Sequence, residues 1–226
     1  MSRPHDRVSV VEPRPLTGEE NMARDEALLD AAAQGHAGCR VYRWSRPTLS
    51  LGYFQRERPS DPALDPLPAV RRLTGGGAIV HDREWTYAVA LPKSHPAAAK
   101  PVGIYDDVHA FLIEAFADVG VSLVRRSDAP LSDGATEPFL CFSRGDERDL
   151  LAGDADPPRD KVVGSAQRRR RGAVLQHGSI LVAASRYAPD LAGIADLFPA
   201  KVSEIDAAVG SFADRLAAYA SSAGGS

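Results

Sequence analysis

The decisive stretch of the sequence is Arg71-Arg72-Leu73-Thr74-Gly75-Gly76-Gly77-Ala78-Ile79-Val80-His81-Asp82. Its three consecutive glycines leave backbone N–H groups open to a ligand, and the two arginines beside them add positive charge. A polarised carbonyl or an anion would fit there. A second segment, Lys161-Val162-Val163-Gly164-Ser165-Ala166-Gln167, brings a lysine whose charge could reach the same acyl oxygen or phosphate. The two segments predict one site, provided that the fold brings them together.

A run of glycines is a weak signal by itself, because Gly-Gly also marks tight turns between strands. That simpler interpretation stays open. The stretch lacks the Gly-Lys-Ser/Thr end of a phosphate-binding loop, and no glycine follows at the spacing of a dinucleotide-binding fingerprint. A strand-like segment also follows the glycines where those folds have a helix. Both nucleotide-binding folds are therefore disfavoured.

The composition is that of an ordinary globular protein with a substantial core. The chain has 226 residues, of which 44% are hydrophobic and 25% charged, enough for one large domain or two small ones. Its net charge of −3 lacks the basic footprint of a dedicated nucleic-acid binder, so any basic surface must be local.

The cysteines argue against a metal centre. There are two, Cys39 and Cys141, and neither belongs to a Cys-x-x-Cys or Cys/His pair with zinc-ligand spacing. No metal is predicted. We find no apolar signal core at the N-terminus and no run of about 18 apolar residues that could span a bilayer. We therefore expect the protein in the cytoplasm.

Periodicity and turn residues predict few helices among many strands. Thr17 and Glu20 form a capping-box pattern, and Gly35 and Gly120 are placed to end helices. We expect helices at 18–34, 104–119 and about 201–219. We expect strands at 7–11, 39–44, 48–54, 69–73, 85–91, 121–124, 139–142, 161–167 and 173–182, a surface loop at 59–68 and an unpacked loop at 145–160.

Because the strands mostly follow one another in sequence, the pattern favours an α+β fold with a mixed, largely antiparallel sheet and flanking helices. We expect a single domain over residues 1–226, with a core at about 8–197.

Four motifs occur in a recognisable order. They are the segment Asn21-Met22-Ala23-Arg24-Asp25-Glu26-Ala27-Leu28-Leu29, the arginine-glycine stretch ending in His81-Asp82, Lys161 with Gly164-Ser165-Ala166-Gln167, and Gln176-His177-Gly178-Ser179. In this order and spacing the chain resembles the lipoate–protein ligase A and octanoyltransferase family over roughly residues 8–197. Four ordered motifs are much more specific than any one of them.

The resemblance implies a fold like the catalytic domains of biotin and lipoate protein ligases, related to class II aminoacyl-tRNA synthetases. It implies attachment of lipoate or octanoate to one lysine of lipoyl domains or of the glycine-cleavage H protein, and Lys161 would contact the acyl carbonyl. The residues expected to bind substrate by resemblance are Arg72, Gly75, Gly76, Gly77, Ala78, His81, Gly164, Ser165, Ala166, His177 and Gly178.

Two chemistries compete within that family. Ligases activate free lipoate with ATP and Mg²⁺, whereas octanoyltransferases take the acyl group from acyl carrier protein without such cofactors, and one branch does so through a cysteine thioester. Cys141, in a Cys-Phe context before the Lys161 motif, matches that nucleophile, and Glu84-x-Thr86-Tyr87 also resembles the transferase pattern. Gly77 is closer to the ligase pattern. Octanoyl transfer through Cys141 is the preferred hypothesis, ligation the alternative, and a buried structural role for Cys141 stays open.

Other polar residues have weaker interpretations. His81 and His177 could orient the incoming amine or hold the loop, and the remaining histidines, His109 among them on a helix surface, are assigned no function. The run Arg168–Arg171 is either a solvated turn or a docking surface for acidic carrier and lipoyl domains. A non-catalytic RNA-binding module is the distant alternative, disfavoured by the net negative charge.

Overall fold

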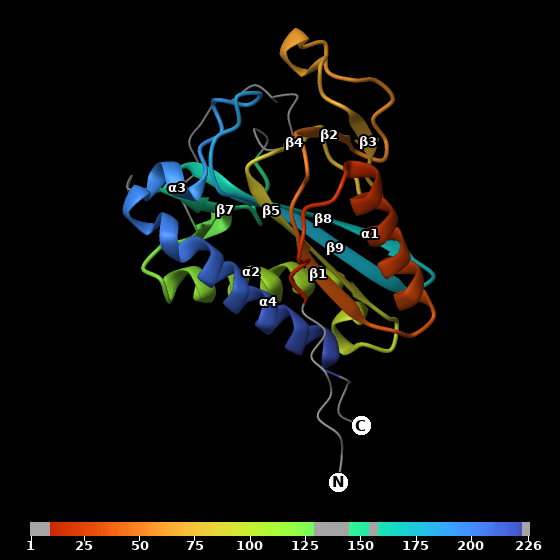
Figure 1. The fold of residues 1–226 in the computed structure, drawn as a ribbon. Helices are drawn as coiled ribbons and strands as arrows, with labels where there is room; N and C mark the ends of the chain where they lie inside the picture. The colour runs from red at the N-terminus through yellow and green to blue at the C-terminus, as the bar shows by residue number, and fades with distance from the viewer. Residues whose placement is uncertain (1–9, 129–144, 154–157, 223–226) are drawn as a thin grey trace.

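The computed structural model describes residues 10–128, 145–153 and 158–222. Within these ranges the larger sheet has the strand order β1-β5-β9-β8-β7-β6, and a smaller one has the order β3-β2-β4 (Figure 1). The strands of the larger sheet are β1 (Gly38–Tyr42), β5 (Glu84–Leu91), β6 (Val124–Arg125), β7 (Leu150–Ala152), β8 (Asp160–Arg170) and β9 (Ala173–Leu181). Those of the smaller sheet are β2 (Thr48–Leu51), β3 (Ala69–Arg71) and β4 (Ile79–His81).

The α-helices are α1 (Gly18–Ala33), α2 (Pro101–Ala117), α3 (Ile194–Leu197) and α4 (Ile205–Ser221), with short 3₁₀ turns at Pro62–Leu64, Pro96–Ala99, Arg126–Asp128 and Pro199–Glu204. The pairings of the larger sheet are antiparallel, whereas β2 pairs β3 in parallel. The predicted α+β class with a mixed, largely antiparallel sheet is therefore confirmed.

Helices cover both faces of the larger sheet, and β5 and β9 are buried along their whole length (Figure 1). Along β5, Tyr87 and Val89 point to the face covered by α2 and α4, while Ala88 and Ala90 point to the face covered by α1. Successive strand residues face opposite sides, so the alternation of large and small residues sets how closely each helix approaches. The small alanines let α1 pack tightly against β5 of the larger sheet.

Helix α1 follows its sequence signals closely. The Thr17 hydroxyl accepts a hydrogen bond from the Glu20 amide, and the Glu20 carboxylate accepts one from the Thr17 amide, which completes the capping box. Gly35 has φ of +101°, a left-handed conformation that ends the helix after Gln34. The prediction of a helix at 18–34 is confirmed.

The smaller sheet departs from the predicted layout. The strands expected at 39–44 and 48–54 belong to different sheets, since β1 pairs β5 while β2 pairs β3 and β4. The expected surface loop at 59–68 is not a plain loop, because Leu64 and Leu67 are buried against Leu49 of β2. The smaller sheet has too little area of its own to form a core, so these leucines complete it.

The second half of the chain also differs in places. The prediction of an unpacked loop at 145–160 is wrong for the described part of this segment. That part contains the buried strand β7 and the buried carboxylate of Asp149. The last helix begins at Ile205 rather than near 201, and Val202 is 54% exposed because it lies in a 3₁₀ turn off the apolar face. The strand predicted at 139–142 lies outside the described residues. Of the strand predicted at 7–11, residues 7–9 also lie outside them, and Val11 forms a single parallel bridge to Val41.

None of the helices in the described ranges has the length and apolar character needed to cross a membrane.

His109 connects α2 to β8. The prediction that it lies on a helix surface is wrong. Its side chain is buried, and its Nε2 lies 2.8 Å from the Ser165 hydroxyl. Burial lowers the pKa of His109 to about 4, although a hydrogen bond to the Arg148 backbone opposes this. The imidazole is therefore neutral at physiological pH.

The lowered pKa of His109 predicts a specific loss of stability in acid. Because the unfolded histidine titrates near 6.5 and the folded one near 4, protons bind preferentially to the unfolded chain as the pH falls through this window. We expect a loss on the order of 2 kcal/mol from this group between pH 7 and pH 5, measured by chemical denaturation.

The variant His109→Gln should lose less stability over that interval, since glutamine can accept from Ser165 without titrating. His36→Gln, at an exposed position, is the matched control and should follow the wild-type pH profile. Parallel profiles for wild type and His109→Gln would exclude His109 as the acid-sensitive group.

Candidate functional site

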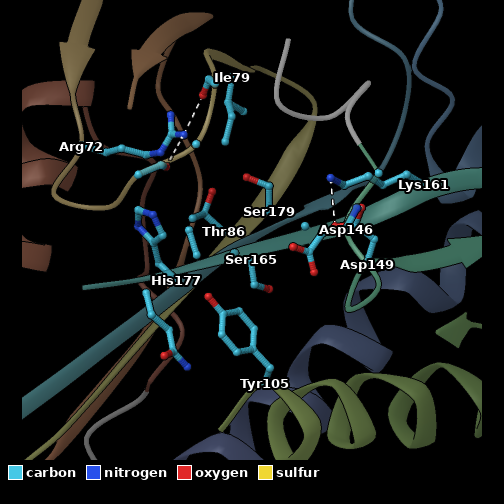
Figure 2. Close-up of a pocket in the computed structure, with 18 residues that line it drawn as sticks. Arg72, Ile79, Thr86, Tyr105, Asp146, Asp149, Lys161, Ser165, His177 and Ser179 are labelled. Atoms are coloured by element: carbon cyan, nitrogen blue, oxygen red, sulfur yellow. Dashed lines mark hydrogen bonds and ion pairs between the residues drawn. The ribbon is translucent and has the colours of Figure 1, made fainter. Parts of the chain in front are cut away.

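A cavity of about 420 Å³ lies where the loop between β3 and β4 meets β8 and β9 (Figure 2). The structure thus brings together the two segments that the sequence singled out. The residues that line the cavity are Arg72, Gly75, Gly76, Gly77, Ile79, Thr86, Tyr105, Gly145, Asp146, Asp149, Lys161, Gly164, Ser165, Ala166, Gln167, His177, Gly178 and Ser179.

The glycine loop needs its glycines for close backbone approach. Gly76 has φ of +93°, which residues with a side chain rarely adopt. A Cβ atom at Gly52, in the turn after β2, would lie 2.0 Å from the Gly76 carbonyl oxygen. The Tyr53 amide also donates to the Thr74 carbonyl at 2.8 Å. The turn after β2 and the glycine loop are therefore held directly against each other.

Arg72 lines the cavity and also binds the glycine loop. Its guanidinium donates to the Ser50 carbonyl and hydroxyl, both at 3.1 Å, and to the carbonyls of Gly75 and Gly77 at 2.7 and 2.6 Å. Arg71 similarly donates to the Gly52 carbonyl at 3.0 Å. Arg72 thus lines the cavity, as expected, while its printed hydrogen bonds hold the glycine loop to β2, and those of Arg71 hold the turn after β2.

On the opposite side of the cavity, Lys161 reaches in from β8 and pairs with Asp149 (Figure 2). The Lys161 ammonium lies 3.0 Å from a carboxylate oxygen of Asp149, and the two side chains are only 7% and 5% exposed. Burial raises the pKa of Asp149, and the neighbouring ammonium opposes that rise. The Asp146 amide donates to the other carboxylate oxygen at 2.7 Å. The lysine charge is thus held in a fixed place by a buried partner.

Ser165 lies on the cavity floor between two other polar groups. Its hydroxyl is 2.6 Å from the Tyr87 hydroxyl and 2.8 Å from His109 Nε2. A backbone hydrogen bond with Arg148 raises the pKa of His109, as a bond from a ring N–H to a carbonyl would. We assign this N–H to Nδ1, which makes Nε2 the acceptor of the Ser165 proton. Ser165 then accepts from Tyr87, so toward the cavity it can act only as an acceptor. A Cβ atom at Gly178 would lie 2.5 Å from this hydroxyl, which explains the glycine there.

His177 lines the cavity from the α1 side. Its Nδ1 lies 3.2 Å from a carboxylate oxygen of Asp25, and its Nε2 lies 2.6 Å from the Thr74 hydroxyl. Asp25 is itself held by the Arg40 guanidinium at 2.7 Å and by the Tyr42 hydroxyl at 2.9 Å. A buried carboxylate on α1 therefore orients the histidine, and the histidine holds the residue that precedes the glycine loop.

Two residues predicted to bind substrate do not line the cavity. Ala78 is fully buried within the core of the smaller sheet. His81 is buried behind the loop, with Nε2 at 2.7 Å from the Ser50 hydroxyl and Nδ1 at 2.7 Å from Glu84. Its ring also stacks on Trp44, with centroids 3.9 Å apart. Both residues support the loop from inside, because their strand position turns them away from the cavity.

Several lining residues have no assigned role in the sequence prediction. Tyr105 comes from α2, where burial raises its pKa to about 12, and Asp149 comes from the segment that was predicted to be unpacked. Neither belongs to a motif. Thr86 did carry a signal, since it lies in the Glu84-x-Thr86 pattern, and its hydroxyl donates to Glu84 at 2.6 Å.

Two arginines of the Arg168–Arg171 run have partners in the structure. Arg168 and Arg170 lie on β8 rather than in a solvated turn: the Arg168 guanidinium stacks 4.2 Å from the Tyr53 ring centroid, and Arg170 pairs with Glu26 and Asp30 of α1.

The two cysteines differ in what the structure describes. Burial raises the pKa of Cys39 to about 12, whereas Cys141 lies outside the described residues.

Within the described residues, no three His, Cys, Asp or Glu side chains are grouped to hold a metal.

Comparisons with solved structures support the fold. Protein Ta0514 of T. acidophilum superposes with a TM-score of 0.66 at 20% identity, covering 92% of this chain and 84% of that one. A lipoate-protein ligase A bound with ATP gives a TM-score of 0.63 at 20% identity, with the same coverage. At this level of identity the likeness shows a shared architecture.

Comparisons with known sequences show the family. An octanoyltransferase LipM of Macrococcus caseolyticus is 38% identical over 176 residues, which cover 71% of this chain and 60% of that protein. The LipM of Oceanobacillus iheyensis is 35% identical over 185 residues, or 77% of this chain and 64% of that one. The chain therefore spans somewhat less than two thirds of these relatives. A model of the lipoyl protein ligase A/B catalytic domain matches residues 17–218, so the chain belongs to that family.

Proposed function

We propose that this protein transfers an octanoyl group from acyl carrier protein to a lysine of a lipoyl domain or of the glycine-cleavage H protein. The observation that carries the proposal is the lining of one cavity by both the glycine loop and the buried Lys161–Asp149 pair. The names of the LipM relatives support octanoyl transfer, and the described residues would form one catalytic unit around this cavity.

The reaction would proceed in two acyl transfers. In the first, the Cys141 thiolate attacks the thioester carbonyl of the donor, and the carrier thiolate leaves. In the second, the amine of the acceptor lysine attacks the Cys141 thioester, an amide bond forms, and the Cys141 thiolate leaves while the amine gives up a proton. Because a thioester conserves the activation of the donor, neither step needs ATP.

The cavity residues have distinct parts in this proposal. The Lys161 ammonium and the backbone N–H groups at Gly75–Gly77 would stabilise the oxyanion that develops on the acyl carbonyl. Ser165, which offers only a lone pair to the cavity, would accept a hydrogen bond from the incoming amine. Gly164, Ala166, His177 and Gly178 would shape the pocket, and Arg72 would act by keeping the glycine loop in place.

Removal of the lysine charge should abolish transfer. The single variant Lys161→Met would leave Asp149 buried without this partner and would confound activity with stability. The double variant Lys161→Met/Asp149→Asn removes both charges together. We expect it to lower octanoylation of apo H protein by about 100-fold or more, with a small change in melting temperature, because oxyanion stabilisation is lost. The measurements are intact mass of the acceptor and thermal unfolding. Turnover near that of the wild type would rule out the proposed role of Lys161.

The thioester should be detectable without an acceptor. Incubation with octanoyl acyl carrier protein alone should add one octanoyl group to the peptide that contains Cys141, and neutral hydroxylamine should remove it. Cys141→Ala should abolish the adduct. Cys39→Ala, at a half-buried cysteine whose pKa is raised by burial, is the control that should keep it. If Cys141→Ala instead retains full activity with octanoate, ATP and Mg²⁺, the protein is a ligase and the thioester mechanism is wrong.

A further inference from the structure

Two exposed aromatic rings stand at the rim of the cavity. Tyr53 and Phe54, in the turn after β2, are 42% and 79% exposed, and their rings meet edge to face with centroids 5.0 Å apart. A Cβ atom placed on Gly75, which lines the cavity, would lie 4.0 Å from the Phe54 ring. The Arg168 guanidinium covers the Tyr53 ring. We call Tyr53, Phe54 and Arg168 the aromatic rim.

The turn that carries these rings is held by its backbone rather than by burial of the rings. Arg71 donates to the carbonyls of Gly52 and Tyr53, at 3.0 and 3.4 Å, and to that of Gln55. The Gly52 amide donates to the Gln55 side chain at 2.9 Å. Phe54 is thus presented to solvent on an ordered support. Large aromatic side chains held in this way are characteristic of interface anchors, which bind at little cost in conformational entropy.

The charges beside the rim are mainly basic. Besides Arg168, which covers the Tyr53 ring, Arg56 is exposed in the same turn, and Glu57 is its exposed acidic neighbour. A chain with a net charge of −3 therefore places local positive charge next to its exposed aromatic rings. A partner with acidic groups around an apolar contact would complement this surface.

On the basis of the proposed function, we infer that the aromatic rim is the docking surface for the acceptor domain, the protein that carries the target lysine. A lysine side chain is only a four-carbon stem, so the acceptor backbone must come up to the rim of the cavity for its amine to reach the acyl carbonyl. A carrier protein presents its acyl thioester on a long prosthetic arm and can dock farther away. The short reach of the lysine therefore assigns the nearest surface to the acceptor.

The test separates acceptor docking from donor chemistry. In the full chain, Phe54→Ser should raise the KM for apo H protein by about tenfold or more, with little change in kcat, because rim contacts act on binding. Formation of the octanoyl enzyme from octanoyl acyl carrier protein alone should be unchanged. Arg168→Gln should raise the same KM mainly at low salt. Val102→Ser, a polar substitution at an apolar residue 53% exposed on α2, is the control and should match the wild type.

Two results would overturn the docking assignment. An unchanged KM in Phe54→Ser would exclude the rim as the acceptor surface, and an equal loss in octanoyl-enzyme formation would place Phe54 in the acyl or donor site instead. Calorimetric titration of apo H protein into the enzyme without a donor keeps the two proposals distinct. If the wild type binds apo H protein and Phe54→Ser does not, docking holds even where no octanoyl enzyme forms and the proposed transfer fails.

Discussion

The site depends on hydrogen bonds by which the Arg72 guanidinium joins the glycine loop to β2. The side chain is 1% exposed, and its donors join β2, through both polar atoms of Ser50, to the carbonyls of Gly75 and Gly77. A buried guanidinium is costly unless its donors are matched, so any displacement of the loop would break bonds to a desolvated charge. A glycine-rich loop that would otherwise sample many conformations is thereby kept in one, and the rim of the cavity with it.

Three buried histidines repeat one arrangement around this loop. His81, His109 and His177 each have Nε2 toward a serine or threonine hydroxyl, and Nδ1 of His81 and of His177 lies beside a carboxylate. An imidazole ring can join two polar groups because each of its two nitrogens forms a hydrogen bond. These residues link the smaller sheet, α2 and α1 to the walls of the cavity. They position the groups that line it.

The ammonium of Lys161 enters the cavity as part of a buried ion pair. Lys161 and Asp149 are buried together with 3.0 Å between the ammonium and a carboxylate oxygen, and Asp149 immediately precedes β7. Pairing lowers the net charge presented to a substrate, but it fixes the position of the ammonium in a medium of low dielectric, where a directed charge is most effective. The proposed oxyanion stabilisation therefore rests on Asp149 as well as on Lys161.

The sequence by itself determined what depends on neighbours in the chain. The capping box of α1, the glycine that ends it, the apolar spacing of α2 and the alternation along β5 predicted those elements correctly, because capping and periodicity are local. Ordered motifs identified the family and the two segments that meet at the cavity.

Only the tertiary structure decided which groups face each other. It directed the donors of Arg72 inward, turned His81 and Ala78 away from the cavity, buried His109 against Ser165 and brought Asp149 to Lys161. Each of these outcomes depends on the order of strands in the sheets, which pairs residues far apart in sequence. Spacing along the chain does not predict such partners, because buried polar groups form hydrogen bonds with residues that are close in the fold but distant in the sequence.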